Sequence, residues 1–323
     1  MFLGIDHGTK AIRFATTDGH CWELPRQEAS GLNAEEILHR IQANLSHCAF
    51  ELVALTYSMG DALTRVMRLE DAPNRGLIQM DGAGEHVGGG TRVFEAIKRS
   101  GWPAVILPGI HRGSDIDPRL KVFSHGMSPE KVGLAYGLYR SGADSFIVSD
   151  ASSNTVTFAV LKGKIIGALD APIFAPGLVQ GPLDVEAIRK VDAGVMTANE
   201  AFTRGGILAK MGLSSLEECS AAEKSYALET LALFAAMEMA ALIILMRDLG
   251  EQSPDLFLAG SPAPMLKERV SVLVGKEVKS LERFAAARGC ACIAEDVFEG
   301  RESILGLEVD ERATFKEAGV RRS

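Results

Sequence analysis

Cysteine, tryptophan and positive charge are all scarce in this sequence. Its 323 residues include 5 Cys and 2 Trp, and 34 Lys and Arg stand against 42 Asp and Glu, for a formal net charge of -8. Five cysteines without a framework spacing exclude a disulfide-stapled scaffold and indicate a reducing, cytoplasmic location. The negative charge argues against a nucleic-acid binder, because neutralising phosphates requires a basic surface.

Long hydrophobic runs and targeting signals are lacking as well. Met1–Thr16 has no basic stretch leading into an apolar one, so we expect no signal peptide. The most apolar stretch, Leu231–Met246, is shorter than the ~20 residues of a membrane span, and Glu238 interrupts it. Because this stretch is apolar on all sides, it predicts a helix buried in a large core and no membrane association. The lone Cys290-x-Cys292 lacks the second pair that a structural zinc site needs.

The composition that remains is that of a globular α/β protein. Hydrophobic residues make up 47% and charged residues 24%, and a chain of this length corresponds to about two domains of ordinary size. Helices are predicted after Ser128-Pro129, near Leu183–Ala193, at Asn199–Lys210 and at Ala221–Asp248, the last with a capping box at its start.

An opening pattern of strand, polar turn and strand occurs twice. The stretch DHGTKAIRFATTDG from Asp6 and the stretch DASSNTVTFAVLKG from Asp150 share the Asp, the Phe-Ala pair and the final Gly without a gap. This similarity predicts a duplicated domain, with residues 1–143 as the first domain and 144–323 as the second. Two unrelated hairpins are the alternative, since hairpins are common.

The first candidate site is the turn that follows the first strand. Gly8 lets the backbone turn tightly and approach a ligand, and Thr9 and Lys10 can donate hydrogen bonds to phosphate oxygens. Asp6 at the strand end can hold Mg²⁺, directly or through water. The alternative is an ordinary Asp-Gly hairpin.

The second candidate site is the matching turn from Asp150, where Ser152, Ser153 and Thr155 offer hydroxyl groups. Two hairpins with carboxylates that face each other would form a clamp for a metal ion and a triphosphate. An ordinary polar turn is the alternative.

The third candidate site is Gly260-Ser261, at the end of the strand predicted over Asp255–Ala259. Small residues at such a junction can pack flat against a nucleotide base or sugar. The alternative is a plain turn between a strand and a helix.

These three motifs, in this order, resemble those of the superfamily of actin, sugar kinases, heat-shock ATPases and acetate kinases. The resemblance implies two ribonuclease-H-like α/β domains, the actin-like ATPase fold, with ATP and Mg²⁺ in a cleft between them. It also implies that Asp6 orders the Mg²⁺ and that the two hairpins hold the phosphates. Gly260 and Ser261 would then lie beside the adenosine.

Within the superfamily, the chain is most similar to the acetate and butyrate kinase branch. The similarity rests on Lys162-Gly-Lys164, Ala171-Pro172 and the stretch from Pro176 to Gly181. More narrowly, the chain resembles the archaeal family called methanogenesis marker protein 12. A homodimer is expected by the resemblance to acetate kinases.

Two departures bear on activity. The second turn, Ala151–Asn154, lacks the glycines of the family, and Gly181-Pro182-Leu183 stands where acetate kinases carry Gly-Thr-Arg, so that arginine is missing. His111-Arg112 or Arg119 could replace it, and Asp117 could act as the base for a hydroxyl acceptor. Alternatively, Arg112 and Arg119 form salt bridges within their loops.

Three hypotheses follow. The first is a kinase that uses Asp6, Asp117 and Arg119 to transfer a phosphoryl group from ATP to a small carboxylate or hydroxyl. The second is a nucleotide-gated switch or assembly factor of methanogenesis that a protein partner reads. The third is a degenerate relative that binds no nucleotide.

Overall fold

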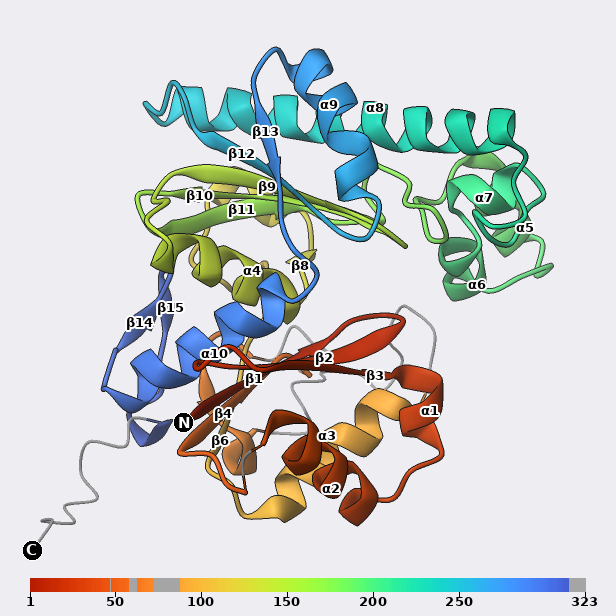
Figure 1. Cartoon of the computed structure of the whole chain (residues 1–323). Coiled ribbons are helices and arrows are strands. Elements are labelled where there is room, and N and C mark those ends of the chain that lie inside the picture. The colour runs from red at the N-terminus through yellow and green to blue at the C-terminus, as the bar shows by residue number, and fades with distance from the viewer. Residues whose placement is uncertain (47, 58–62, 73–87, 314–323) are drawn as a thin grey trace, which may run out of the picture. The chain divides into compact units, whose positions relative to one another are not determined.

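The computed structural model describes residues 1–46, 48–57, 63–72 and 88–313, and Figure 1 shows it as a ribbon. It is a mixed α/β structure with two compact units. The described part of residues 1–143, together with residues from Phe284 onward, forms unit 1, and Asp144–Arg283 forms unit 2.

Unit 1 is built on a mixed sheet in the order β3-β2-β1-β4-β6-β5. Its strands are β1 (Phe2–His7), β2 (Ala11–Thr16), β3 (Cys21–Pro25), β4 (Leu52–Leu55), β5 (Met67–Arg68) and β6 (Ala104–Ile106). The first three strands form antiparallel hairpins, whereas β4 runs parallel to β1 and β6 runs parallel to β4. This arrangement places the carboxyl end of β1 beside that of β4.

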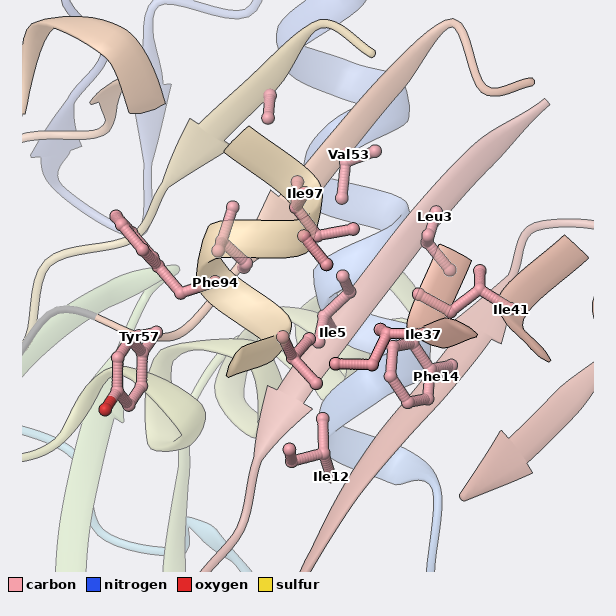
Figure 2. Packing of buried hydrophobic residues seen from close by; sticks show 14 of the residues in the cluster. Leu3, Ile5, Ile12, Phe14, Ile37, Ile41, Val53, Tyr57, Phe94 and Ile97 are labelled. Carbon is pink, nitrogen blue, oxygen red and sulfur yellow. The ribbon is translucent and has the colours of Figure 1, made fainter. Parts of the chain in front are cut away.

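One face of this sheet carries the hydrophobic core of unit 1, which Figure 2 shows from close by. Leu3 and Ile5 of β1 belong to the core together with side chains of α2 (Ala34–Leu45) and α3 (Gly89–Ser100). Helix α2 begins with a reciprocal capping box between Asn33 and Glu36, which satisfies two free amide groups at its first turn.

The other face of the sheet is covered by α10 (Ala285–Phe298), which packs on β1 and β4 and against α4 (Pro129–Arg140). Glycines allow this close approach: a Cβ atom added at Gly4 would lie 2.0 Å from the Ala287 carbonyl oxygen, and one added at Gly289 would lie 1.8 Å from that of Gly133. Buried Asp296 of α10 accepts hydrogen bonds from Tyr136 and Arg140 of α4. The sequence analysis assigns no helix to this segment.

Unit 2 repeats the strand order of unit 1. Its sheet runs β11-β10-β9-β12-β13, with β9 (Phe146–Ala151), β10 (Thr155–Leu161), β11 (Lys164–Leu169), β12 (Asp255–Ala259) and β13 (Val278–Ser280). As in unit 1, the first three strands are antiparallel and the next two are parallel to the first. Asp6 and Asp150 are each the fifth residue of a six-residue strand. This agrees with the predicted duplication.

Helices α8 (Ala221–Asp248) and α9 (Ala263–Val274) pack against each other and against the sheet of unit 2. The prediction that the stretch Leu231–Met246 is buried on all sides is wrong: Leu233 is 45% exposed and Ile244 68%, because only one side of α8 enters the core. Among the described residues, α8 is a helix whose length and composition alone would suit a membrane span, yet its inner side lines the core of unit 2.

Shorter elements complete the two units. They are α1 (Arg26–Ser30), η1 (Leu69–Asp71), β7 (Ile110–His111), η3 (Pro118–Val122), β8 (His125–Met127), α5 (Val185–Asp192), α6 (Ala198–Thr203), α7 (Ile207–Lys210), β14 (Ser303–Ile304), β15 (Leu307–Glu308) and η4 (Glu311–Ala313). The single helix predicted over Asn199–Lys210 is therefore two short helices.

The units differ from the predicted domains at the C-terminal end. The chain divides between Ala143 and Asp144, but the segment from Phe284 packs with unit 1 and not with the preceding residues. The small residues of α10 explain this, because they fit against Gly4 of β1 and Gly133 of α4.

Candidate functional site

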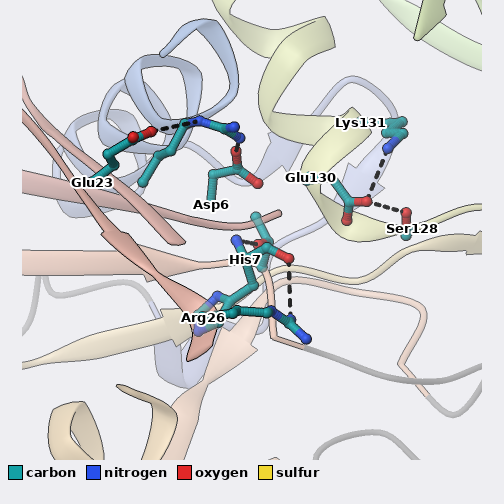
Figure 3. A network of polar contacts seen from close by, with 9 residues as sticks. Asp6, His7, Glu23, Arg26, Ser128, Glu130 and Lys131 are labelled. Atoms are coloured by element: carbon teal, nitrogen blue, oxygen red, sulfur yellow. Dashed lines mark hydrogen bonds and ion pairs between the residues drawn. The ribbon is translucent and has the colours of Figure 1, made fainter. Parts of the chain in front are cut away.

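Asp6 lies near the carboxyl end of β1, 4% exposed, on the face that α10 covers. Arg13 is its partner in the β1–β2 ladder and donates from Nη1 to Asp6 Oδ2 over 3.3 Å, as Figure 3 shows. The other oxygen, Oδ1, is buried and has no hydrogen-bond partner among the described residues. Buried polar atoms normally have partners, so this oxygen is available to a ligand.

Glu130, in the first turn of α4, is the second carboxylate near Asp6. It accepts hydrogen bonds from Ser128 Oγ at 2.5 Å and from Lys131 Nζ at 2.9 Å. Burial, followed by the charge of Glu130, raises the pKa of Asp6 to about 6, while Arg13 and Lys131 oppose the shift. Burial also acts to raise the pKa of Glu130, but the charge of Lys131 and the two hydrogen bonds outweigh it and lower that pKa.

Asp6 could supply one ligand to a divalent cation. The described residues contain no group of three His, Cys, Asp or Glu side chains that could hold a metal ion by itself. Mg²⁺, however, is commonly held by one or two carboxylates, with phosphate and water completing its six ligands. The partnerless Asp6 Oδ1 is a suitable ligand of this kind.

The turn after β1 contains the other predicted residues of the first site. Thr9 and Lys10 are exposed, and Gly8 is partly exposed. A Cβ atom at Gly8 would lie 2.9 Å from both the Ala11 carbonyl oxygen and Arg13 Nη1, so the glycine leaves room for the arginine beside Asp6.

The second turn is held in place by the segment that follows β11. The amide groups of Leu178 and Val179 donate to the carbonyl oxygens of Ser152 and Ser153, each over 2.9 Å. A Cβ atom at Gly177 would lie 2.3 Å from Asn154 Cα. The glycine that permits close approach here therefore lies in the neighbouring segment, which explains how the turn forms without glycines of its own.

Thr155 does not have the role that the sequence predicts. Its side chain is fully buried, and its hydroxyl group donates to the Pro176 carbonyl oxygen over 3.1 Å. The hydroxyl therefore tethers the segment after β11 and is not presented to a ligand. Ser152 and Ser153 are partly exposed.

The second and third motifs meet within unit 2. Gly260 follows β12 with φ of +97°, and a Cβ atom there would lie 2.7 Å from the Ala151 carbonyl oxygen and 3.0 Å from Asp150 Oδ1. Ser261 is exposed beside it. Gly260 thus satisfies two requirements, a left-handed backbone and contact with the second turn.

Asp117 and Arg119 are engaged with each other. Arg119 donates from Nε and Nη2 to the two carboxylate oxygens of Asp117 at 2.9 and 2.8 Å, and Asp117 also caps η3. The hydrogen bond from Arg119 lowers the pKa of Asp117, which makes Asp117 a weak base. Arg112 donates to the carbonyl oxygens of Lys121 and Val122, and His111 Nε2 lies 2.9 Å from that of Leu63. The alternative of a salt bridge within the loop is met by Arg119, whereas Arg112 is held by hydrogen bonds to carbonyl groups.

The Cys290-x-Cys292 pair lies on α10. Burial, followed by the charges of Asp6 and Glu130, raises the pKa of the Cys290 thiol well above its ordinary value. The thiol is therefore expected to stay protonated in the chain without a bound metal.

The sequence analysis missed Arg13, Glu130 and Lys131. Arg13 could have been found from the register of a tight hairpin, which places it opposite Asp6. Glu130 follows the helix start at Ser128-Pro129, but no local signal connects that start to β1.

Comparison with solved structures identifies the fold. Acetate kinase from Entamoeba histolytica superposes with a TM-score of 0.53 at 12% identity, covering 84% of this chain and 85% of that one. The Lmo2764 protein of Listeria monocytogenes gives 0.51 at 13% identity, covering 91% and 98%. The chain has the two-domain α/β fold of the actin-like ATPases and sugar kinases.

Within that class, the chain belongs to the UPF0285 family of archaeal proteins. It is 47% identical over 322 residues to the UPF0285 protein of Methanosarcina mazei, covering 96% of this chain and 99% of that protein. The UPF0285 protein of Methanocaldococcus jannaschii is 38% identical over 326 residues, with 95% and 98% covered. No family model matches the chain.

Proposed function

We propose that this protein binds ATP with Mg²⁺ and transfers a phosphoryl group to a small carboxylate or hydroxyl acceptor. The observation that carries the proposal is the buried, partnerless Oδ1 of Asp6, directly before the exposed turn of Thr9 and Lys10. A carboxylate oxygen of this kind is what a phosphate-bound cation requires. The fold shared with an acetate kinase supports the same assignment.

The residues then have distinct roles. Asp6 holds the Mg²⁺, which when bound neutralises charge on the transferring phosphate. Thr9 and Lys10 donate to phosphate oxygens. In unit 2, Ser152 and Ser153 approach the phosphates, and Gly260 and Ser261 contact the adenosine, since the structure brings these two motifs together.

A second candidate function is favoured by the contacts that Arg112 and Arg119 make. Arg119 donates to Asp117 and Arg112 donates to backbone carbonyl groups, and these contacts favour a protein that lacks the arginine of the acetate kinases. ATP binding without transfer would make the protein a nucleotide-gated switch or assembly factor that a partner protein reads. We also propose that the chain is a member of the methanogenesis marker protein 12 family. We further propose that it is cytoplasmic and forms a homodimer.

Calorimetry of ATP and ADP with Mg²⁺ tests nucleotide binding. We expect Asp6→Asn to weaken ATP binding at least tenfold, and we expect no change in the matched variant Asp192→Asn on exposed α5. Absence of binding in the native chain at millimolar nucleotide would contradict both functions and leave the degenerate relative. Acceptor-dependent release of ADP, measured over a set of small carboxylates and alcohols, separates the kinase from the switch.

A further inference from the structure

His7 is the next residue of β1 after Asp6, and its side chain points to the opposite face of the sheet, because side chains alternate along a strand. It is 7% exposed, and neither Nδ1 nor Nε2 has a hydrogen-bond partner among the described residues. The ring nitrogens of an imidazole are hydrogen-bonding groups, and buried groups of this kind normally have partners.

Arg26, at the start of α1, lies beside His7 and is also incompletely satisfied. Its Nη2 donates to the His7 carbonyl oxygen over 3.3 Å, as Figure 3 shows, whereas its Nε is buried without a partner. Arg26 makes no ion pair with any carboxylate in the part of the chain that the structure describes. A partly buried guanidinium without an anion is an unusual arrangement, because buried charges are normally paired.

The beginning of α3 lies against Arg26 and Tyr57. A Cβ atom at Gly90 would be 2.9 Å from Arg26 Nη2 and 2.7 Å from Tyr57 Cε2. The Tyr57 ring lies 4.7 Å from the His7 ring, and its hydroxyl group lies 2.7 Å from Thr91 Oγ1. The first turn of α3 therefore contacts Arg26 directly and is linked to His7 through the Tyr57 ring.

The electrostatics of this arrangement favour an anion. The N-terminus of a helix carries a partial positive charge and presents amide donors. An arginine beside it is repelled, unless a negative group lies between the two. Gly89 and Gly90 are buried, so bulk water does not screen this repulsion well.

We propose that His7, Arg26 and the first turn of α3 form a binding site for the oxyanion of a small molecule, a carboxylate or a phosphate. The guanidinium supplies the charge and paired donors, the imidazole supplies one N–H, and the helix supplies its free amide groups. Because His7 and Asp6 face opposite sides of β1, this site is distinct from the proposed metal cluster and does not depend on nucleotide binding.

The test uses inorganic phosphate and acetate as probes, without nucleotide and without Mg²⁺. We expect calorimetry to show saturable binding of at least one probe by the full chain in the millimolar range, and the probe that binds more tightly identifies the source of the oxyanion. Arg26→Gln should weaken binding at least tenfold. Arg99→Gln, an equal change of charge at the exposed end of α3, should leave it unchanged.

Two further variants keep the proposal falsifiable if Arg26→Gln fails to fold. His7→Phe removes both ring nitrogens at similar volume and should reduce binding while the chain stays folded. Full retention of binding in this variant would show that His7 only packs, and would overturn the proposal. Loss of phosphate binding in Lys10→Gln but not in His7→Phe would assign the anion to the turn after β1 and overturn the proposal equally. If neither probe binds to the native chain, the proposal is also overturned.

Discussion

The two units share a strand order but differ in the polar groups that lie under their helices. In unit 1, Asp6 is near Glu130 and Arg13, so the cluster against α4 and α10 is charged. In unit 2, the buried polar cluster lies on the opposite face of the sheet: Ser149 directly precedes Asp150, so it points to the other side of β9, where it and Thr157 are fully buried against α8. The strand order is therefore repeated in the two units, but the face that carries the buried polar cluster is not.

Glu238 of α8 completes the cluster of unit 2 and is fully buried. Its Oε2 lies 2.7 Å from Thr157 Oγ1, which lies 2.9 Å from Ser149 Oγ, and its Oε1 accepts from the Ala175 amide over 3.3 Å. Burial raises the pKa of Glu238 to about 8. A protonated Glu238 can donate to Thr157, whose single hydroxyl hydrogen then goes to Ser149. The raised pKa therefore favours a neutral Glu238 in this cluster at pH 7.

The largest effect is expected at Gly4, where unit 2 has Val148 at the same strand position. Gly4→Ala places a Cβ atom 2.0 Å from the Ala287 carbonyl oxygen, so α10 must move away from β1. We expect a loss of about 3 kcal/mol or more in the free energy of unfolding. Gly31→Ala, where the nearest atom is 3.6 Å away, is the control for denaturant unfolding and should change little. Equal stability of the two variants would show that α10 does not depend on this contact.

Glu238→Gln tests whether the unit 2 cluster is neutral. Because the pKa is raised to about 8 in the folded chain, the unfolded chain loses this proton first, near the ordinary value of 4.5. Folding stability is then reduced as the pH rises from 4.5 to about 8, by at most about 1.4 kcal/mol per pH unit. Glutamine stays neutral, so the stability of the variant relative to the native chain should increase over that range in urea unfolding. A constant difference from pH 5 to 8 would contradict a protonated Glu238.

Thr155→Val separates a structural hydroxyl from one that binds phosphate. Loss of the hydrogen bond to Pro176 should cost about 1 kcal/mol in thermal or urea unfolding. ATP affinity should stay unchanged, whereas Ser153→Ala should reduce it. A decrease in affinity at Thr155 equal to that at Ser153 would restore the role predicted from the sequence.

The smallest effect is expected at Asp117. Asp117→Ala removes the cap of η3 and the pair with Arg119, which we expect to cost about 1 kcal/mol or less, since Arg119 is exposed. Any ATP-dependent release of ADP should be unaffected. A large fall in that rate with normal stability would return Asp117 to the catalytic residues.

The sequence predicted those features that depend on neighbouring residues. The hairpins at Asp6 and Asp150 were found because alternation along a strand and turn residues are local signals. The capping box of Ser220 and Glu223 placed the start of helix α8 correctly. A stretch that is apolar on all sides, however, does not indicate which side of the helix faces the core.

Other features depend on residues far apart in the chain. Helix α10 was missed because Ala285–Ala287 and Gly289 have a weak apolar pattern, and distant β1 and α4 determine where it lies. Asp6 was identified as a site residue because its turn is a local signal. Glu130 was missed because it is far from Asp6 in the sequence and comes near it only in the folded chain.

The docking of α10 on β1 has a consequence for biosynthesis. During translation, β1 and its neighbouring strands leave the ribosome well before Ala285–Phe298, so the side of the sheet that α10 covers stays without this helix until residue 298 has been made. The strands of the central segment, Asp144–Arg283, are all made before α10, so this segment can fold first. A nascent chain released before Phe284 would expose the glycine-lined side of β1 to other proteins.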